Sequence, residues 1–247
     1  MTIKGKRILV VGASSDMAFS LNGMLIKGGA SVGLHYNKNA SALKEYEENS
    51  RIKKFQKNLD SSPLCYDLVD EFVAWAGGID CLIQLSGDIL EPVHWEKLSE
   101  KHWHYDLNAN LLVPFFLAQR AIKHMNDEGG GRIILMSTAS ASHGGGSTSL
   151  AYGVSKAGVE CMVKGLARDC AKYNILVNSI APGFIKTKFH TKRMLRTEAQ
   201  LEERVNIIPL KRAGTTEEIA GTILFLLSEY SAYITGQVIT VSGGDWL

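Results

Sequence analysis

The sequence predicts a single α/β domain built on a doubly wound, parallel, seven-stranded sheet with helices on both faces. Short apolar runs alternate with longer amphipathic runs along all 247 residues, which is the pattern of repeated βαβ units. Right-handed crossovers between parallel strands place the helices on both faces of the sheet. Hydrophobic residues make up 45% of the chain and charged residues 21%, which supplies a large core and excludes a wholly disordered chain. No linker, repeat or low-complexity tract divides residues 1–247, so we expect one domain.

The first half of the chain supplies four of the expected strands, at residues 7–11, 31–35, 52–58 and 81–85. Between them we expect a helix over 16–27, a polar helix over 40–49, and a helix that starts at Ser62-Pro63 and ends at Gly77-Gly78. Serine followed by proline favours a helix start, and a glycine pair favours a helix end.

The second half continues the alternation with a long helix over 100–126, strands at 132–137, 175–180 and 238–241, and helices over 150–173 and 216–228. Thr215 or Thr216 is expected to cap the last helix. Within the long helix, Pro114 cannot donate to the carbonyl of Asn110, four residues earlier, so we expect a kink there. A water on the freed carbonyl would be able to connect to Lys156.

The turn after the first strand is a candidate phosphate site. Gly12 permits a sharp backbone, and Ser14 and Ser15 lead into a helix whose free N–H groups and dipole attract an anion. Asp16 and Ala18 stand where a dinucleotide-binding turn usually has its second and third glycines. Asp16 would cap the helix, or would repel a pyrophosphate if it pointed inward. An ordinary strand-to-helix turn is the alternative.

The end of the second strand reads Tyr36-Asn37-Lys38, with one cation and no carboxylate. An acidic residue at this place would hold the ribose 2′-OH of NAD(H), whereas a cation tolerates and attracts an additional 2′-phosphate. The segment therefore predicts a preference for NADP(H), with NAD(H) still possible. Alternatively, Lys38 is a solvated loop cation.

Tyr152 and Lys156 are four residues apart, so on a helix they share one face. An ammonium beside a phenol is expected to lower the phenol pKa from about 10, giving a general acid/base for a carbonyl or alcohol oxygen. A surface Tyr–Lys pair has the same spacing. The context favours chemistry, because Ser137-Thr138-Ala139-Ser140 and Pro182-Gly183 follow other strands at the same predicted sheet edge.

These motifs together resemble the classical short-chain dehydrogenase/reductase family over the whole chain. The resemblance is carried by the Gly12 turn, residues 103–110, Gly131-Arg132-Ile133-Ile134, Tyr152-Gly153-Val154-Ser155-Lys156, residues 177–183, residues 233–237 and Gly243-Gly244. In character the chain resembles 3-oxoacyl-(acyl-carrier-protein) reductases and related carbonyl reductases. The resemblance implies a Rossmann-type NAD(P)-binding fold and hydride transfer between a nicotinamide and a ketone or secondary alcohol.

The resemblance also implies the roles of the catalytic residues. Tyr152 is the acid/base, and Lys156 lowers its pKa and holds the nicotinamide ribose. Asn110 anchors a proton-relay water. Thr138 is assigned the hydroxyl that polarises the substrate carbonyl, with Ser140 as the alternative.

By the same resemblance, cofactor contacts are spread over the turns that follow the strands. The predicted set is Gly12, Ser14, Ser15, Met17, Tyr36, Asn37, Lys38, Asn58, Leu59, Ser86, Gly87, Tyr152, Lys156, Pro182, Gly183, Ile185 and Thr187. The family's Asn-Asn-Ala-Gly reads Gln84-Leu85-Ser86-Gly87 here, so Gln84 would have to replace the scaffold hydrogen bond of the first Asn.

A segment over about residues 184–210 is expected to fold over the substrate as a lid. It carries Lys186, Lys188, His190, Lys192, Arg193 and Arg196. This composition favours an anionic or carrier-linked carbonyl or alcohol substrate, although a solvated helix face looks the same. A 3-oxoacyl thioester reductase, a sugar or polyol dehydrogenase and a catalytically weak dinucleotide-binding module are the functions left open.

Charge and composition restrict the partners. The net charge of +2 argues against nucleic acid, the apolar runs are too short to span a membrane, and residues 1–7 carry no apolar leader. Four cysteines without metal-ligand spacing predict a reducing cytoplasm and no metal site. The family resemblance implies a homotetramer, or a homodimer, with helices over 110–121 and 152–167 at one interface and the last strand with Trp246-Leu247 at another.

Overall fold

Parallel strands form the centre of the molecule, in the order β3-β2-β1-β4-β5-β6-β7. The computed structural model describes residues 3–245. Its strands are β1 Arg7–Val11, β2 Ser31–Tyr36, β3 Ile52–Gln56, β4 Cys81–Gln84, β5 Gly131–Met136, β6 Ile175–Pro182 and β7 Val238–Val241. Every neighbouring pair is parallel. The predicted doubly wound parallel sheet is confirmed.

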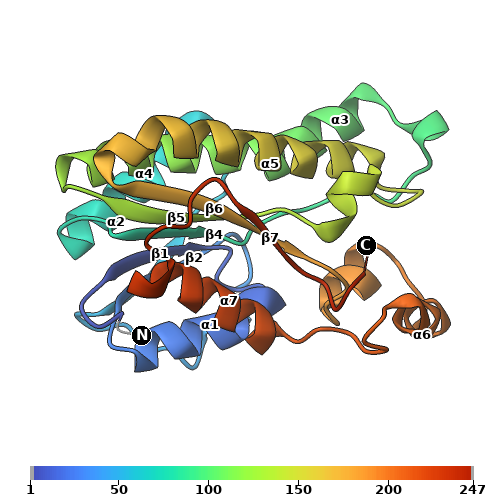
Figure 1. The fold of residues 1–247 in the computed structure, drawn as a ribbon, viewed down its shortest axis with the longest axis horizontal. Coiled ribbons are helices and arrows are strands. Elements are labelled where there is room, and N and C mark those ends of the chain that lie inside the picture. The colour runs from blue at the N-terminus through green and yellow to red at the C-terminus, as the bar shows by residue number, and fades with distance from the viewer. Residues whose placement is uncertain (1–2, 246–247) are drawn as a thin grey trace.

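Helices cover both faces of this sheet. They are α1 Asp16–Lys27, α2 Ser62–Ala76, α3 Glu100–Leu107, α4 Val113–Asp127, α5 Leu150–Cys170, α6 Glu198–Ile207 and α7 Thr216–Leu227. Figure 1 shows α2, α4 and α5 on one face and α1 and α7 on the other. No helix within residues 3–245 has the length and apolarity needed to cross a membrane.

The central strand β1 explains why its sequence is apolar without interruption. Ile8 and Val10 belong to the core cluster shared with α1 and α7, whereas Leu9 and Val11 belong to the cluster shared with α2, α4 and α5. Successive side chains of a strand point to opposite faces, and helices cover both faces here. All four side chains are therefore fully buried.

Several expected elements differ from the structure in their bounds or in kind. The polar helix over 40–49 is wrong, since only the 3₁₀ turn Ser41–Leu43 forms there. Leu43 is the one residue of 40–49 that is buried, so the stretch has no apolar stripe to hold a helix against the core. The third strand ends at Gln56, two residues before the expected end.

The long helix is interrupted where Pro114 predicts a kink. It divides into α3, a π-helical turn over Asn108–Leu112, and α4. The Val113 N–H donates to the carbonyl of Asn108, five residues back. This wide turn lets Asn110 leave the regular helical path. Further along, Thr215 caps α7 by accepting a hydrogen bond of 3.3 Å from the Glu218 N–H.

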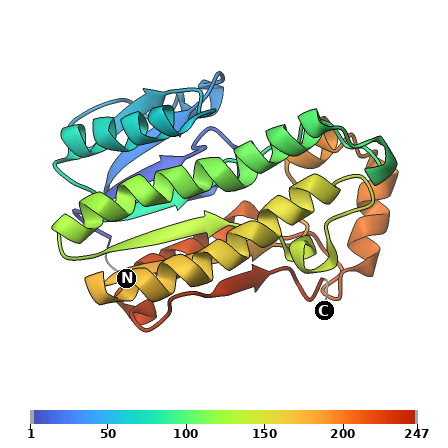
Figure 2. The ribbon, with the colours of Figure 1, turned by 90° about the horizontal axis from the view of Figure 1, so that it is seen from above.

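The strand order creates a crevice at one edge of the sheet. From β1 the chain proceeds outward to β2 and β3, and it then returns to β4 on the other side of β1. Connections diverge at such a switch point, which is where doubly wound sheets bind ligands, outside the carboxyl ends of the strands. Figure 2 shows α6 beyond that end of the sheet. Trp246 and Leu247, expected at a subunit interface, lie outside the described residues.

Candidate active site

The turn after β1 packs tightly against the loop after β4. Gly12 has φ +82°, and a Cβ at this position would lie 2.7 Å from the backbone nitrogen of Ser86. Only glycine fits both constraints. The Gly12 N–H donates to Nδ1 of His35 (3.2 Å), and Nε2 of the same ring donates to the Lys57 carbonyl (2.9 Å). Burial lowers the pKa of His35 to about 4, so the ring stays neutral.

The helix start beside this turn is capped by Ser15, whose hydroxyl accepts from the Ala18 N–H at 3.3 Å. Asp16 is therefore not the cap. Its Oδ2 accepts a hydrogen bond of 2.7 Å from the Lys188 N–H, and its Oδ1 lies 3.3 Å from the Lys188 ammonium. The carboxylate thus faces the segment 184–210.

Residues predicted for the adenosine end meet where β2 and β3 end. The Asn37 amide donates to Oδ1 of Asn58 (3.0 Å), and the Asn58 amide donates to Asp60 (2.7 Å). Tyr36 is half-buried, and Lys38 is exposed beside Asn37. The structure therefore brings the two predicted strand ends together, with an exposed cation next to them.

Lys156 is buried at the centre of the site, with 1% of its surface exposed. Its ammonium donates to the Met136 carbonyl at the end of β5 (2.8 Å) and lies 5.7 Å from the centroid of the Tyr152 ring. Burial lowers the pKa of Lys156 to about 7. Burial, and to a lesser extent the charge of Asp106, raises the pKa of Tyr152 above its usual value. The expected lowering of the phenol pKa is wrong for this arrangement, because desolvation of the phenol sets the direction of the shift.

Asn110 is fully buried, and its side chain is fixed by main-chain groups. Its amide donates to the carbonyls of Asp88 (2.6 Å) and Asp106 (2.8 Å), while its Oδ1 accepts from the Asp88 N–H (3.0 Å). A Cβ on Gly87 would lie 2.9 Å from Oδ1 of Asn110 and 3.3 Å from the ammonium of Lys156. Gly87, Asn110 and Lys156 therefore form one packed group.

The hydroxyls after β5 divide into two kinds. Ser137 is buried, and it donates to Glu160 of α5 at 2.6 Å, so it joins the strand to the helix. Thr138 and Ser140 are partly exposed, and their hydroxyl oxygens lie 3.2 Å apart and share one hydrogen bond. Both remain available to a ligand, so the geometry leaves the choice between them open.

The scaffold role expected of Gln84 is visible at the end of β4. Its amide donates to the carbonyl of Ser86 (2.7 Å) and to the Ser86 hydroxyl (2.8 Å). The loop that carries Ser86 and Gly87 is thus fixed by the hydrogen bonds from Gln84 and by its contact with Asn110. The remaining predicted cofactor residues also follow the strands: Ser14 in the turn after β1, Met17 in the first turn of α1, Leu59 after β3, and Pro182, Gly183, Ile185 and Thr187 at and after the end of β6.

The segment 184–210 reaches the catalytic residues. The Phe189 ring lies 6.0 Å from the Tyr152 ring, measured between centroids, with an angle of 36° between the planes. The carboxylate of Asp88 forms an ion pair with Arg193 and accepts a hydrogen bond of 2.7 Å from the Tyr105 hydroxyl. Asp88 therefore connects two parts of the site. Its main chain is hydrogen-bonded to Asn110, and its side chain is paired with Arg193 of the segment 184–210.

The charge of this segment is smaller than its composition suggests. Asp16 pairs with Lys188, and Asp88 pairs with Arg193. Burial lowers the pKa of His190 to about 4, so this ring is neutral near pH 7. Among the described residues, Lys186, Lys192 and Arg196 are the expected cations for which no carboxylate partner is found, and all three are exposed.

Asp88 and Asp106 were not among the residues singled out from the sequence. Asp106 has 2% of its surface exposed, its Oδ1 accepts from the Leu90 N–H (2.9 Å), and burial raises its pKa. A signal existed for both acids. Asp88 directly follows Gly87, and Asp106 lies one helical turn before Asn110, on the same face.

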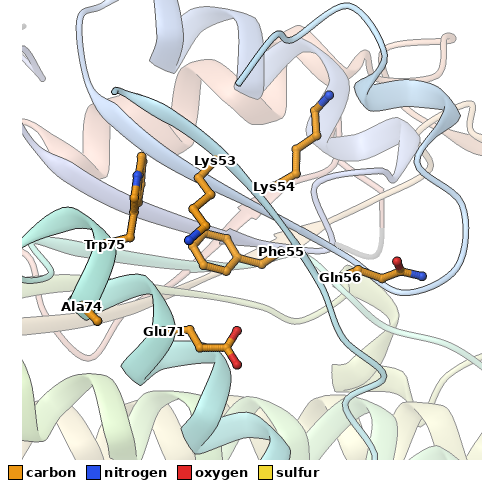
Figure 3. Close-up of a pocket in the computed structure, with 7 residues that line it drawn as sticks. All are labelled: Lys53, Lys54, Phe55, Gln56, Glu71, Ala74 and Trp75. Carbon is orange, nitrogen blue, oxygen red and sulfur yellow. The ribbon is translucent and has the colours of Figure 1, made fainter. Parts of the chain in front are cut away.

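A hollow of about 500 Å³ lies at the outer edge of the sheet between β3 and α2. Figure 3 shows Phe55, Glu71 and Trp75 among the side chains that line it. The Lys53 ammonium lies 5.2 Å from the centroid of the Phe55 ring. Its lining shares no residue with the predicted site. The catalytic candidates therefore gather at the switch point between β1 and β4 and not in this hollow.

Comparison with known proteins agrees with this geometry. The family model described as enoyl-(acyl carrier protein) reductase matches residues 12–245. The 3-oxoacyl-(acyl-carrier-protein) reductase FabG of Thermotoga maritima is 33% identical over 249 residues, covering 99% of each chain. The 2-dehydro-3-deoxy-D-gluconate 5-dehydrogenase of Escherichia coli is 31% identical over 251 residues, covering 100% of this chain and 97% of the relative.

Solved structures agree as well. A short-chain type dehydrogenase/reductase from Mycobacterium ulcerans superposes with a TM-score of 0.90 at 25% sequence identity, covering 99% of this chain and 90% of that chain. Fold, motif positions and sequence similarity thus lead to one assignment. The chain belongs to the short-chain dehydrogenase/reductase family of NAD(P)-dependent oxidoreductases.

Proposed function

We propose that this protein reduces a small-molecule ketone to a secondary alcohol with NADPH, Tyr152 giving the proton to the carbonyl oxygen. One observation carries the proposal. Tyr152 lies beside the packed group of Gly87, Asn110 and Lys156 at the switch point of the sheet, and the Phe189 ring lies against the Tyr152 ring. The reverse oxidation uses the same residues with the proton moving back to Tyr152. The four cysteines, all free in the described residues, favour a protein that works in the reducing cytoplasm.

The residues present fit a nicotinamide dinucleotide. The Gly12 turn leaves its backbone without a side chain at the start of α1, where free N–H groups favour a phosphate. Lys156 supplies an ammonium further along the same edge, and Asn37 and Asn58 supply amides at the other end. When bound, the dinucleotide supplies the hydride. Lys38, with no carboxylate at positions 36–38, supports NADP(H) over NAD(H).

The state of the phenol supports proton donation. Because burial raises the pKa of Tyr152, the side chain keeps its proton at neutral pH, as a general acid in ketone reduction requires. Lys156, with a pKa of about 7, exchanges its own proton near the same pH and is the group through which the phenol would be reprotonated. Asn110 orients the surrounding loop.

A hydroxyl is needed to hold the substrate carbonyl, and we assign this role to Thr138. Thr138→Ala should lower kcat/KM by about 10²-fold if its hydroxyl polarises the carbonyl, the size expected for one preorganised donor. Ser140→Ala is the matched variant, because the two hydroxyls share a hydrogen bond. A larger loss in Ser140→Ala would transfer the role to Ser140.

The deciding experiment compares the wild type with Tyr152→Phe. NADPH binding is measured by fluorescence titration, and turnover is measured on a panel of 3-oxoacyl thioesters and sugar-acid ketones, the classes that the relatives' names suggest. We expect unchanged binding and a loss of turnover of about 10²- to 10⁴-fold. Retained turnover would refute the role of Tyr152. Saturable binding by the wild type without turnover on any substrate would instead favour a dinucleotide-binding module.

A further inference from the structure

The start of α1 poses an electrostatic problem for the proposed cofactor site. Asp16 is the first residue of that helix, directly after the Ser15 cap. In this family the diphosphate is expected beside the same helix start, where the N–H groups and the helix dipole favour an anion. A bare carboxylate there repels a diphosphate, and two like charges separated by about 4 Å cost from about 1 kcal/mol in water to about 4 kcal/mol near a protein surface.

Lys188 lies where it neutralises the charge of Asp16. It contacts Asp16 twice, through its main-chain N–H (2.7 Å to Oδ2) and through its ammonium (3.3 Å to Oδ1). The two residues are 172 positions apart in the chain. The Lys188 side chain is 71% exposed, so its ammonium is accessible to a ligand from solvent.

The ammonium of Lys188 has hydrogen-bond donors that Asp16 does not use. A lysine ammonium carries three N–H donors, and one contact with Asp16 leaves the others directed toward solvent. Arg193, another paired cation of the segment, instead holds the carboxylate of Asp88 through two of its nitrogens. Lys188, paired with Asp16, still has N–H donors for a second anion.

We propose that Lys188 is a ligand of the cofactor diphosphate, and that it neutralises Asp16 while it donates to a phosphate oxygen. The proposal rests on the proposed function, since it concerns the same NADP(H) site. It also links cofactor binding to the catalytic residue: Phe189, which follows Lys188, lies against the Tyr152 ring. Holding Lys188 on the diphosphate would therefore hold Phe189 over the phenol.

A double-mutant cycle tests the proposal on the full-length protein. The variants are Lys188→Met, Asp16→Asn and the double variant, with Lys192→Met as the control, an exposed lysine of the same segment with the same change of charge. The Kd for NADPH and for ADP-ribose, which keeps the diphosphate but lacks the nicotinamide ring, is measured by titration. Thermal unfolding of each variant verifies the fold.

We expect Lys188→Met to raise the Kd for both ligands by about tenfold or more, because it removes a phosphate contact and exposes the Asp16 charge. The double variant should recover part of that loss, Asp16→Asn should bind at least as tightly as the wild type, and Lys192→Met should change the Kd by less than about twofold. The deficit of Lys188→Met should shrink as salt screens the repulsion.

Two results would overturn the proposal: a Kd for Lys188→Met equal to that of Lys192→Met, or a double variant that binds no more tightly than Lys188→Met. Either leaves the proposed function untouched as long as the wild type binds NADPH. If the wild type shows no saturable binding of NADPH, the proposed function fails first.

Discussion

His35 shows how one buried side chain sets the geometry of a binding turn. It accepts the Gly12 N–H and donates to the Lys57 carbonyl, and its pKa of about 4 reflects a ring that is buried in its neutral form. An unfolded histidine takes up its proton near pH 6.5, whereas the folded one does so only near pH 4. The stability that His35 contributes is therefore complete above pH 6.5 and is lost as the pH falls from 6.5 toward 4.

His35→Asn, which keeps an acceptor for Gly12, should remove this pH dependence. Between pH 7.5 and pH 4.5 the wild type should lose roughly 2–3 kcal/mol more unfolding free energy than the variant. Urea unfolding at the two pH values measures the difference. Parallel losses in both proteins would contradict the neutral buried ring.

Lys38 carries the prediction about cofactor preference. Lys38→Glu should raise the Kd for NADPH by about tenfold, because a carboxylate would face the 2′-phosphate, while the Kd for NADH should be nearly unchanged. Lys44→Glu makes the same change of charge at another exposed position and serves as control. Titrations with both dinucleotides provide the measurement, and equal weakening of NADPH and NADH would contradict the assignment.

At the residue scale, the sequence indicates the candidate site but not the ion pairs around it. Tyr152, Lys156, Asn110 and Gly12 follow from spacing and motif. The partner of Asp16 could not be found in this way, because Lys188 lies far along the chain, in a segment whose path no periodicity determines. The phenol pKa was misjudged for a related reason, since spacing gives the ammonium but not the degree of burial.

At the scale of elements, Asp88 connects the segment 184–210 to the loop that holds Asn110. The side chains of Arg193 and Asp88 are 43% and 30% exposed, and such an ion pair contributes about 0.5–1 kcal/mol. Asp88→Asn should weaken that pair while leaving the main-chain hydrogen bonds to Asn110 in place. The segment should then open roughly two to five times more often.

Limited trypsin digestion measures this opening, because the segment contains several lysines and arginines. Cleavage between residues 184 and 210 should accelerate in Asp88→Asn by the same factor. Asp169→Asn, which removes the pair with Arg168 at the exposed end of α5, should cleave at the wild-type rate. Identical digestion of Asp88→Asn and the wild type would mean that the pair does not restrain the segment.

Elements were predicted well where they bury an apolar face, and poorly where they do not. The strand β1 has the predicted bounds, and the helix α7 ends one residue before its predicted end, because the apolar residues of both elements fill the core. Residues 40–49 are polar, and helix propensity alone does not hold such a stretch. The π-helical form of the kink before Pro114 could not be read from a proline alone, since a proline requires only that the regular bond be lost.

At the scale of the whole molecule, apolar side chains remain exposed on two surfaces. Leu112 and Val154 are exposed near α4 and α5, and Phe225, Tyr230 and Tyr233 near α7 and β7. Large exposed apolar groups favour association between chains. We therefore expect a homotetramer, formed through both surfaces.

Sedimentation at micromolar concentration should give four times the chain mass of 27.0 kDa. Val154→Glu should block one surface only and halve the mass, and Tyr233→Lys should do the same through the other surface. Unfolding curves verify that each variant is folded. A wild-type monomer would contradict both interfaces.

The contact between Asp16 and Lys188 has a consequence for the history of the family. A relative with glycine in place of Asp16 has no carboxylate to neutralise and no need of a cation in place of Lys188. The two positions should thus change together among descendants of a common ancestor. Gly12, wedged against Ser86, should stay constant in all of them.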